Sequence, residues 1–391
     1  MVLALLLARM GVDVVVLEKH ADFLRDFRGD TVHPSTLEIM YELGILDEFL
    51  KRPHQEIRAA SVQIGQDTIP MMDLRHLPTH CKFVAMMPQW EFLNFISAQA
   101  AEYPAFHLKM QAEVTDLIHE NGRIVGALAK TPDGPVKVRA LLVVGADGRR
   151  SVVRECAGLK AIDLGAPMDV FWMRINRASS DPADSLGRID RGHMFVMINR
   201  EEYWQCAFLI PKGSADEVRQ KGIEAFQRSI LEIAPFLGER VQELNDWNDV
   251  SLLTVAVDRL EKWYKPGLLC IGDAAHAMSP IGGVGINLAI QDAVAIANLL
   301  GAILLQRSPS ESELATVQQR RMFPTRVTQG FQVLAQNNII RRVLASDKNK
   351  PMRAPWFMKL FGRFPFLRRI PARMLGVGVR PEHVRTPKVA A

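Results

Sequence analysis

Two glycine-containing stretches hold the residues of this sequence that could do chemistry. The later one, GDAAHAMSPIGGVGIN at 272–287, places Asp273 after a short apolar run and places Gly282, Gly283 and Gly285 ahead of a long apolar pattern. Glycine lets a backbone pass close to a ligand, and the N–H groups that open a helix stabilise negative charge. A carboxylate at a strand end can accept hydrogen bonds from a polyol. The stretch therefore indicates a site for a flat ligand with hydroxyl groups and negative charge.

The earlier stretch, LLVVGADGRRSVVRE at 141–155, is an apolar run that ends in Gly-Ala-Asp-Gly and enters a helical pattern with three arginines. Ligands of open α/β sheets bind at the carboxyl ends of parallel strands. Asp147 could accept a hydrogen bond there, while Arg149, Arg150 and Arg154 supply positive potential. An aspartate that caps a helix beside solvated arginines explains the same letters.

Side chains that catalyse a reaction by themselves are not evident. We find no Ser-His-Asp set, no pair of carboxylates and no metal-binding cluster, so we predict no metal site and assign no catalytic residue. His276 in the DAAH segment could act as an acid or a base, but at a helix entrance a structural role is favoured.

The elements that must position these stretches begin at residue 1. Residues 1–10 predict a helix ending at Gly11, and VDVVVLE at 12–18 predicts a strand that closes on an acid. In dinucleotide-binding units such an acid hydrogen-bonds a ribose hydroxyl, so Glu18 is a candidate; an acid that merely caps the strand is the alternative. The sequence does not contain the strand and G-x-G-x-x-G turn that precede such a helix. We expect a start placed too far downstream, or a truncation.

Further along, antiparallel strand patterns with one helical segment fill 160–262, and a helical pattern after 312 is interrupted at Pro324. The aromatic residues of this strand-rich module could line an apolar cleft or form a plain core; they are Trp172, Phe195, Tyr203, Trp204 and Phe208. We predict a cofactor-binding domain in the segments 1–65, 82–159 and 263–305, a substrate domain in 66–81 and 160–262, and C-terminal helices and tail in 306–391.

Composition excludes several classes of protein. The 391 residues are 48% hydrophobic and 23% charged, which excludes a disordered or fibrous chain, and the net charge of +5 fits an anionic small molecule without indicating nucleic acid. The four cysteines form no C-x-x-C pair, as expected of reduced thiols in a cytoplasmic protein. The apolar segment 286–305 carries Asp292 and predicts a buried helix. The tail mixes cations with large apolar residues, so peripheral membrane contact is conceivable, but its prolines favour packing against the body.

Three features in this order, Glu18, GADGRRSVVR at 145–154 and GDAAHAMSPIGGVGINLAIQDA at 272–293, resemble the flavoprotein aromatic hydroxylases, which are FAD-dependent monooxygenases related to para-hydroxybenzoate hydroxylase. The resemblance covers nearly the whole chain. It implies an α/β fold in which a Rossmann-like FAD-binding domain carries an inserted α+β substrate domain of antiparallel sheet, followed by C-terminal helices.

The resemblance assigns a set of residues to FAD: Glu18, Arg28, Gln89, Val114, Asp147, Asp273, Pro280, Gly283, Gly285, Ile286 and Asn287. Glu18 would bind the adenosine ribose, and Arg28 and Gln89 would contact the phosphates and the ribityl chain. Val114 would contact adenine through its backbone, Asp147 the FAD and nicotinamide pyrophosphate region, and Asp273 the ribityl or ribose hydroxyls. Pro280 and the backbone from 283 to 287 would lie beside the isoalloxazine.

The family also implies the reaction. NADH or NADPH reduces the flavin, O2 adds to it, and a flavin C4a-hydroperoxide hydroxylates an aromatic or other apolar small molecule. One alternative is an FAD-dependent reductase or dehydrogenase of a prenyl-type substrate that inserts no oxygen. The other is a truncated, non-catalytic remnant that acts as a binding protein, since the missing turn would leave the pyrophosphate without its cradle.

Overall fold

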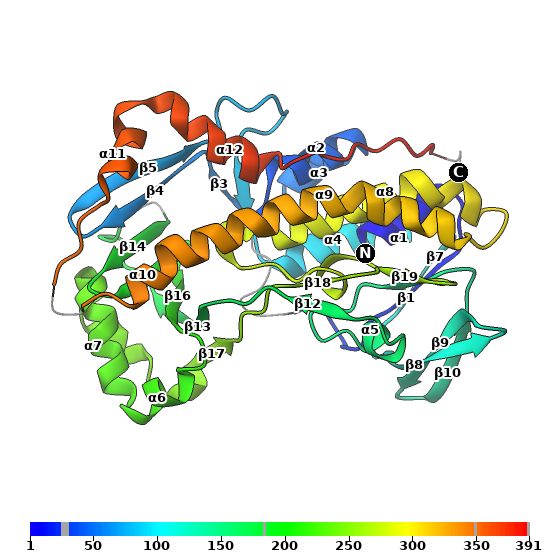
Figure 1. Cartoon of the computed structure of the whole chain (residues 1–391), viewed down its shortest axis with the longest axis horizontal. Helices are drawn as coiled ribbons and strands as arrows, with labels where there is room; N and C mark the ends of the chain where they lie inside the picture. Colours follow the sequence, from blue (N-terminus) through cyan, green and yellow to red (C-terminus); the bar gives the residue numbers. More distant parts are fainter. Residues whose placement is uncertain (25–30, 183–184, 348–349, 389–391) are drawn as a thin grey trace.

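The computed structural model describes residues 1–24, 31–182, 185–347 and 350–388 (Figure 1). Its helices are α1 (Val2–Arg9), α2 (Pro34–Glu42), α3 (Leu46–Leu50), α4 (Gln89–Ala101), α5 (Val152–Cys156), α6 (Ala215–Gln220), α7 (Ile223–Ile233), α8 (Gly285–Leu304), α9 (Glu311–Ala335), α10 (Arg341–Leu344), α11 (Trp356–Arg363) and α12 (Arg369–Gly376).

The strands before residue 150 are β1 (Val14–Leu17), β2 (Thr31–Val32), β3 (Gln55–Ile57), β4 (Ala59–Ile64), β5 (Asp67–Asp73), β6 (Val84–Met86), β7 (Phe106–Lys109), β8 (Glu113–Glu120), β9 (Arg123–Thr131), β10 (Gly134–Arg139) and β11 (Val143–Gly145). Those after it are β12 (Ala161–Asp163), β13 (Met168–Asn176), β14 (Leu186–Asp190), β15 (His193–Asn199), β16 (Tyr203–Pro211), β17 (Val250–Leu253), β18 (Asp258–Leu260), β19 (Tyr264–Lys265) and β20 (Leu268–Cys270).

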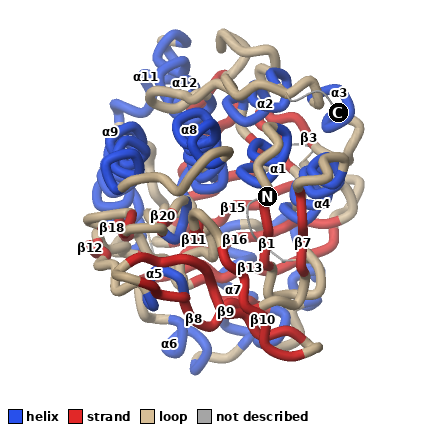
Figure 2. Tube along the Cα trace, turned by 90° about the vertical axis from the view of Figure 1, so that its right-hand side faces the viewer, coloured by secondary structure: helices blue, strands red, loops and turns tan. Residues whose placement is uncertain are grey.

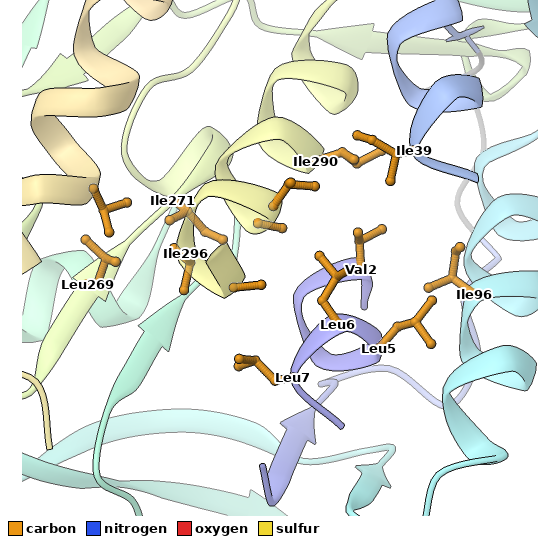
Figure 3. Packing of buried hydrophobic residues seen from close by; sticks show 14 of the residues in the cluster. Val2, Leu5, Leu6, Leu7, Ile39, Ile96, Leu269, Ile271, Ile290 and Ile296 are labelled. Atoms are coloured by element: carbon orange, nitrogen blue, oxygen red, sulfur yellow. The ribbon is translucent and has the colours of Figure 1, made fainter. Parts of the chain in front are cut away.

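The largest core lies around α1, as the apolar opening of the sequence predicts. Leu5, Leu6 and Leu7 of α1 are buried. Figure 3 shows Leu5 and Leu6 between Ile290 and Ile296 of α8 and Ile96 of α4. Polar backbone groups of a helix are bonded within the helix, so an all-round apolar helix can be fully buried. The strands β20 and β11 close this core from the other side.

The parallel strands next to this core form two small sheets rather than one. β1 pairs in parallel with β7, while β11 pairs in parallel with β20, which also pairs with β19 (Figure 2). Within the described residues neither β1 nor β11 has a strand on its other side. Val15 on β1 is accordingly 46% exposed, as is usual for a side chain at a sheet edge.

The second large unit is a seven-stranded sheet in the order β17-β13-β16-β15-β14-β4-β5. It is antiparallel except where β14 meets β4. One face packs on α7 through Phe171, Phe195 and Phe208, which contact Phe226 or lie in the same buried cluster. Because side chains alternate along a strand, the neighbours of these residues face the opposite side. There, Trp172 lies half-buried on the face that meets the α8 loop.

The sequence left open whether the aromatic residues of 160–262 form a core or line an apolar cleft, and the structure divides them into a buried group and a half-buried group. Phe195, Trp204 and Phe208 belong to the core under α7, whereas Trp172 and Tyr203 remain half-buried. The sheet also takes in β4, so the early part of the chain enters it at residue 59. The domain boundaries themselves remain a prediction.

Helices α8 and α9 pack along the core, and α11 and α12 lie together against β5 at one end of the molecule (Figure 1). The segment Ile281–Leu304, which includes α8, is long and apolar enough to cross a membrane, yet 61% of its most apolar window is buried inside the protein. It carries the fully buried Asp292, and we therefore interpret it as the predicted core helix. Helix α9 continues through Pro324, although an interruption was expected there.

Candidate cofactor site

The two glycine-containing stretches meet at one edge of a sheet. β11 and β20 run parallel with Gly145 opposite Cys270, so the turns that follow them emerge side by side. The Nε of Arg149 donates to Oδ2 of Asp273 at 3.1 Å, which joins the earlier stretch to the later one across 124 residues of sequence. Both side chains remain about one third exposed, at 29% and 32%. A carboxylate and a guanidinium thus stand together where a ligand can reach them.

Arg149 carries an unused hydrogen-bond donor at this point. Its Nη1 atom is buried and has no acceptor among the described residues. A buried donor on a charged group that is left unpaired costs stability, so such atoms usually have a partner. A phosphate or hydroxyl oxygen of a bound ligand would supply it. The sequence indicated positive potential at Arg149, but it gave no sign of this pairing with Asp273.

The glycine loop between β20 and α8 is shaped by positive backbone angles. Gly282 and Gly283 have φ values of 75° and 61°, in a region that residues with a Cβ rarely adopt. A Cβ on Gly283 would lie 2.2 Å from Oγ1 of Thr31, a separation that no real contact allows. The hydroxyl of Thr31 donates to the carbonyl of Gly283 at 2.8 Å. The loop backbone therefore passes close to Thr31, which fixes it on one side; its predicted close approach to a ligand remains a prediction.

The loop leads directly into the N-terminus of α8. The backbone N–H groups in the first turn of a helix have no acceptor within the helix. Those of Gly285, Ile286 and Asn287 also find none elsewhere in the described chain. Together with the partial positive charge of the helix end, they form a place where negative charge on a ligand is stabilised. Pro280, Gly285 and Ile286 are half-buried, as a contact surface for a ligand requires.

Asn287 holds this helix end in place with its side chain. Its Nδ2 donates to the carbonyl of Thr31 at 2.9 Å, and its Oδ1 accepts from the backbone N–H of His33 and the hydroxyl of Thr36, both at 2.8 Å. The side chain is buried. Asn287 was predicted for its backbone alone; the structure adds a side chain that ties the loop to the segment 31–36.

A buried ion-pair network, composed of His276, Asp292 and Arg321, supports the other end of the loop. Oδ2 of Asp292 lies 2.6 Å from Nε2 of His276, and Oδ1 accepts from Nε of Arg321 at 2.9 Å. All three side chains are at most 1% exposed. Asp292 also accepts from the N–H of Gly272, the residue before Asp273, at 3.1 Å. The predicted structural role of His276 is confirmed, since its ring lies in the core.

Electrostatics keep Asp292 charged in spite of this burial. Burial acts to raise its pKa, but the electrostatic attraction and the hydrogen bonds of His276 and Arg321 outweigh it, so the pKa lies below its ordinary value. The network extends to the C-terminal segment, because Glu382 pairs with Arg320 at 2.6 Å and with Arg321 at 3.4 Å. The one charged residue in the apolar pattern at 286–305 was the available signal for Asp292. Nothing in the sequence indicated its partners.

The side chain of Asp147 forms hydrogen bonds within the turn that connects β11 to α5. It accepts from the backbone N–H of Val153 at 3.1 Å and from the hydroxyl of Ser151, which in turn caps α5. This is the capping arrangement that the sequence left open beside a ligand contact. Contact of Asp147 with a cofactor remains a prediction.

The early candidate residues form a second group. The backbone carbonyl of Glu18 accepts from the N–H of Ala112 at 2.8 Å, and the N–H of Glu18 donates to the carbonyl of Lys109 at 2.9 Å, so Glu18 lies close in space to the segment that leads to Val114. Oε1 of Glu18 accepts from the N–H of His20. Gln89 is the first residue of α4. Arg28 lies outside the described residues.

The half-exposed loop faces the seven-stranded sheet through Ile281. This side chain belongs to an apolar cluster with Val170, Leu209 and the half-buried Trp172 and Val196. The sheet face opposite α7 and the glycine loop thus form two apolar walls of one region. Among the described residues, no group of three or more His, Cys, Asp or Glu side chains could hold a metal ion.

Comparison with known proteins gives consistent matches. Residues 1–330 match the family described as FAD binding domain. The chain is 31% identical over 390 residues to a 6-methylpretetramide 4-monooxygenase from Streptomyces rimosus, a match that covers 98% of this chain and 91% of that protein. It is 24% identical over 337 residues to a para-nitrophenol 4-monooxygenase from a Pseudomonas strain, which covers 82% and 80% of the two chains.

Solved structures share the fold. The crystal structure of p-nitrophenol 4-monooxygenase from Pseudomonas putida superposes with a TM-score of 0.76 at 19% identity, covering 97% of this chain and 95% of that one. A probable FAD-dependent monooxygenase from Pseudomonas aeruginosa superposes with a TM-score of 0.72 at 20% identity and covers 88% and 94%. The Rossmann-like domain with an inserted antiparallel sheet, as predicted, is the fold of this chain.

Proposed function

The chain belongs to the FAD binding domain family and is an FAD-dependent monooxygenase, and from this premise we propose that it hydroxylates a flat aromatic molecule with NADH or NADPH and O2. The observation that carries the assignment of the site is the pair formed by Arg149 and Asp273, with the unpaired Nη1 of Arg149 buried next to it. These groups lie where the loop that connects β20 to α8 begins.

We assign FAD to this edge of the sheet. Asp273 would accept from hydroxyls of the ribityl chain, and Nη1 of Arg149 would donate to a neighbouring oxygen of the cofactor. The loop backbone from Gly283 to Asn287 would lie beside the isoalloxazine, and Glu18, Gln89 and Val114 would contact the adenosine half. Bound FAD supplies the electron transfer and oxygen activation that no side chain of the protein can provide.

The protein's own residues have three tasks in this proposal. The N-terminus of α8 stabilises negative charge next to the ring system because its N–H groups point outward without acceptors. Asn287 and Asp292 hold the loop so that this end does not shift. The apolar residues Ile281 and Trp172 exclude water from the region where oxygen is transferred.

The substrate would lie between the glycine loop and the sheet face that carries Trp172 and Val196. This face is apolar, and its half-buried side chains leave contact area for a planar molecule. An aromatic substrate fits such walls because stacking and apolar contact need no charged partner. Relatives of this chain are named for aromatic compounds, among them 6-methylpretetramide and para-nitrophenol, which supports this class without identifying the compound.

The reaction is tested by incubating the FAD-loaded protein with NADH or NADPH, labelled O2 and a panel of phenolic and polycyclic aromatic compounds. We expect one labelled oxygen atom in the product of at least one compound, detected by mass spectrometry. A product that loses hydrogen without gaining the label would support the prenyl-type reductase or dehydrogenase instead. That alternative is not favoured, because the relatives are named as monooxygenases.

The site is tested separately with Arg149→Met, which keeps an unbranched but shorter side chain and removes the donors. Loss of a charged hydrogen bond of about 1.5–3 kcal/mol should weaken FAD binding roughly ten- to a hundredfold. Arg228→Met on α7 serves as the control, since Arg228 is exposed and lies on the far face of the sheet. If the natural chain does not bind FAD at all, that result would instead support the alternative of a truncated, non-catalytic binding protein. A cytoplasmic location remains a proposal.

A further inference from the structure

The charge of this chain is concentrated in one C-terminal segment. Residues 350–380 contain eight cationic residues and no acidic one, although the whole chain has a net charge of only +5, so the remainder carries a net charge of −3. The cations are Lys350, Arg353, Lys359, Arg363, Arg368, Arg369, Arg373 and Arg380. Surface charges of both signs are usually interspersed, so this separation needs a reason.

The segment is folded onto the body through its inward side chains. Met358 of α11 and Ala354 are buried against β4 and β5, and Ala372 of α12 is buried among Leu74 and Leu77. The N–H of Met352 donates to Asp190 at 2.8 Å. Helices α11 and α12 therefore have fixed inner and outer faces. Both figures that show the whole chain place the two helices together on the outside of the molecule (Figures 1 and 2).

The outer faces expose large apolar side chains. Trp356 is 77% exposed, and four others between 41% and 64%: Phe357, Phe364, Phe366 and Ile370. Arg363, Arg369 and Arg373 are interspersed with them in the sequence, are exposed, and form no ion pair with a carboxylate in the part of the chain that the structure describes. Exposed aromatic groups beside unpaired arginines are not expected of a surface that faces only water.

The five exposed apolar side chains and the three unpaired arginines of the preceding paragraph together form what we name the α11–α12 surface. We propose that this surface docks on an anionic phospholipid bilayer. Aromatic rings are stable at the level of the lipid headgroups, where one side of the ring is apolar and the other is wet. Arginines bind the phosphate groups of the same headgroups, and several cations close together are attracted to the negative potential of an anionic membrane.

The arrangement of the side chains favours a bilayer over an acidic protein. The five apolar groups stand out from two short helices and the turn between them, and a fluid boundary accommodates separate projecting groups without a matching shape. The helices cannot cross the membrane, because each has eight residues and a span needs about twenty. Pro365 follows the end of α11, whereas Pro371 lies in the first turn of α12. The segment packs inward, as its prolines were expected to favour, and it also exposes its outer face.

The proposal is tested by sedimentation of the full-length, FAD-loaded protein with vesicles of phosphatidylcholine alone or with 30% phosphatidylglycerol added. We expect binding to the anionic vesicles, weaker binding to the neutral ones, and a decrease as salt is raised. The double variant Arg363→Glu/Arg369→Glu should reduce binding to the anionic vesicles by at least roughly thirtyfold. Trp356→Ala/Phe366→Ala should reduce binding to both kinds of vesicle.

The matched control is Lys137→Glu/Arg228→Glu, which makes the same change in net charge on exposed residues of β10 and α7, away from this surface. It should bind like the natural chain, and thermal unfolding should show that every variant remains folded. Equal vesicle binding by the two charge-reversed variants would overturn the proposal, as would no binding of the natural chain to either vesicle. Binding to soluble polyglutamate but not to vesicles would overturn it in favour of an acidic macromolecule.

Discussion

The late loop at 272–293 and the early strand that ends at Glu18 are both parts of the cofactor site as the sequence predicts it, yet they are built differently. The late loop is held by buried side chains on both sides, Asn287 at the helix entrance and Asp292 behind Gly272. Glu18 follows a strand with one paired edge, on which Val15 is almost half exposed. Both regions are predicted to contact the ligand, but among the described residues the late loop is the one that buried side chains hold in position on both sides.

The largest loss of stability is expected from a substitution of Asp292, which supports the late loop. Asp292→Asn removes the carboxylate nearest to the buried Arg321 and the one that is hydrogen-bonded to His276, so the free energy of unfolding should fall by about 3–5 kcal/mol. Urea unfolding followed by circular dichroism measures this. Asp216→Asn, which changes a carboxylate that is 89% exposed, is the control and should change stability by no more than about 0.5 kcal/mol. Equal, small effects of both substitutions would mean that the network does not support the loop.

Low pH should destabilise the protein through protonation of the Asp292 carboxylate, which supports the late loop. The folded protein holds the pKa of Asp292 below its ordinary value of 3.8, because the attraction of His276 and Arg321 outweighs the effect of burial. A depressed carboxyl pKa contributes stability that is present above the unfolded value and is lost as pH falls through the folded one. Unfolding midpoints measured from pH 6 to pH 3 should therefore decrease below about pH 4. The decrease should be smaller in Asp292→Asn; an identical decrease would exclude Asp292 as a source.

A smaller effect is expected at the other support of the loop. Asn287→Ala removes four hydrogen bonds and leaves the N–H of His33 buried without an acceptor. The expected loss of stability is about 1–3 kcal/mol. Hydrogen exchange should show faster exchange in the segment 31–36 and in the loop. If exchange increases evenly over the whole chain instead, the side chain does not act on this contact.

The smallest effect is expected at Glu18. Glu18→Gln keeps the shape and removes the charge on a half-exposed group, so unfolding should change by less than about 0.5 kcal/mol. FAD affinity, measured by fluorescence titration, should fall by roughly two- to tenfold for the loss of one partly exposed hydrogen bond. A larger loss of affinity than that caused by substitution at Asp273 would reverse the comparison between the two regions.

The sequence predicted the elements around the site because their signals are local. The helix at 1–10, the acid after the strand at 12–18 and the glycine turns each depend on a few neighbouring residues, and the structure has the helix, the strand and the positive φ angles there. The order and separation of the two motifs carried the resemblance to the flavoprotein aromatic hydroxylases, whereas the pairing of β11 with β20, which brings the motifs to one edge, comes from the structure.

The supports of the site could not be predicted, because they join residues far apart in the chain. Asp292 meets Arg321 across 29 residues, and Asn287 meets His33 across 254. No spacing rule connects such pairs. Pro324 was expected to interrupt its helix, but α9 continues through it, and the carbonyl of Pro324 accepts a hydrogen bond from the hydroxyl of Thr328. Tertiary packing overrode the local preference in that case.

The central claim is that the late loop binds FAD through Asp273, and one titration tests it most directly. Flavin fluorescence is followed as FAD is added to the natural chain and to Asp273→Ala, with urea unfolding on the same samples. We predict saturable binding to the natural chain and roughly ten- to a hundredfold weaker binding to the variant, because an ionised acceptor worth about 1.5–3 kcal/mol is lost. Unchanged FAD affinity in a folded variant would contradict the claim and leave Asp273 as a partner of Arg149 alone.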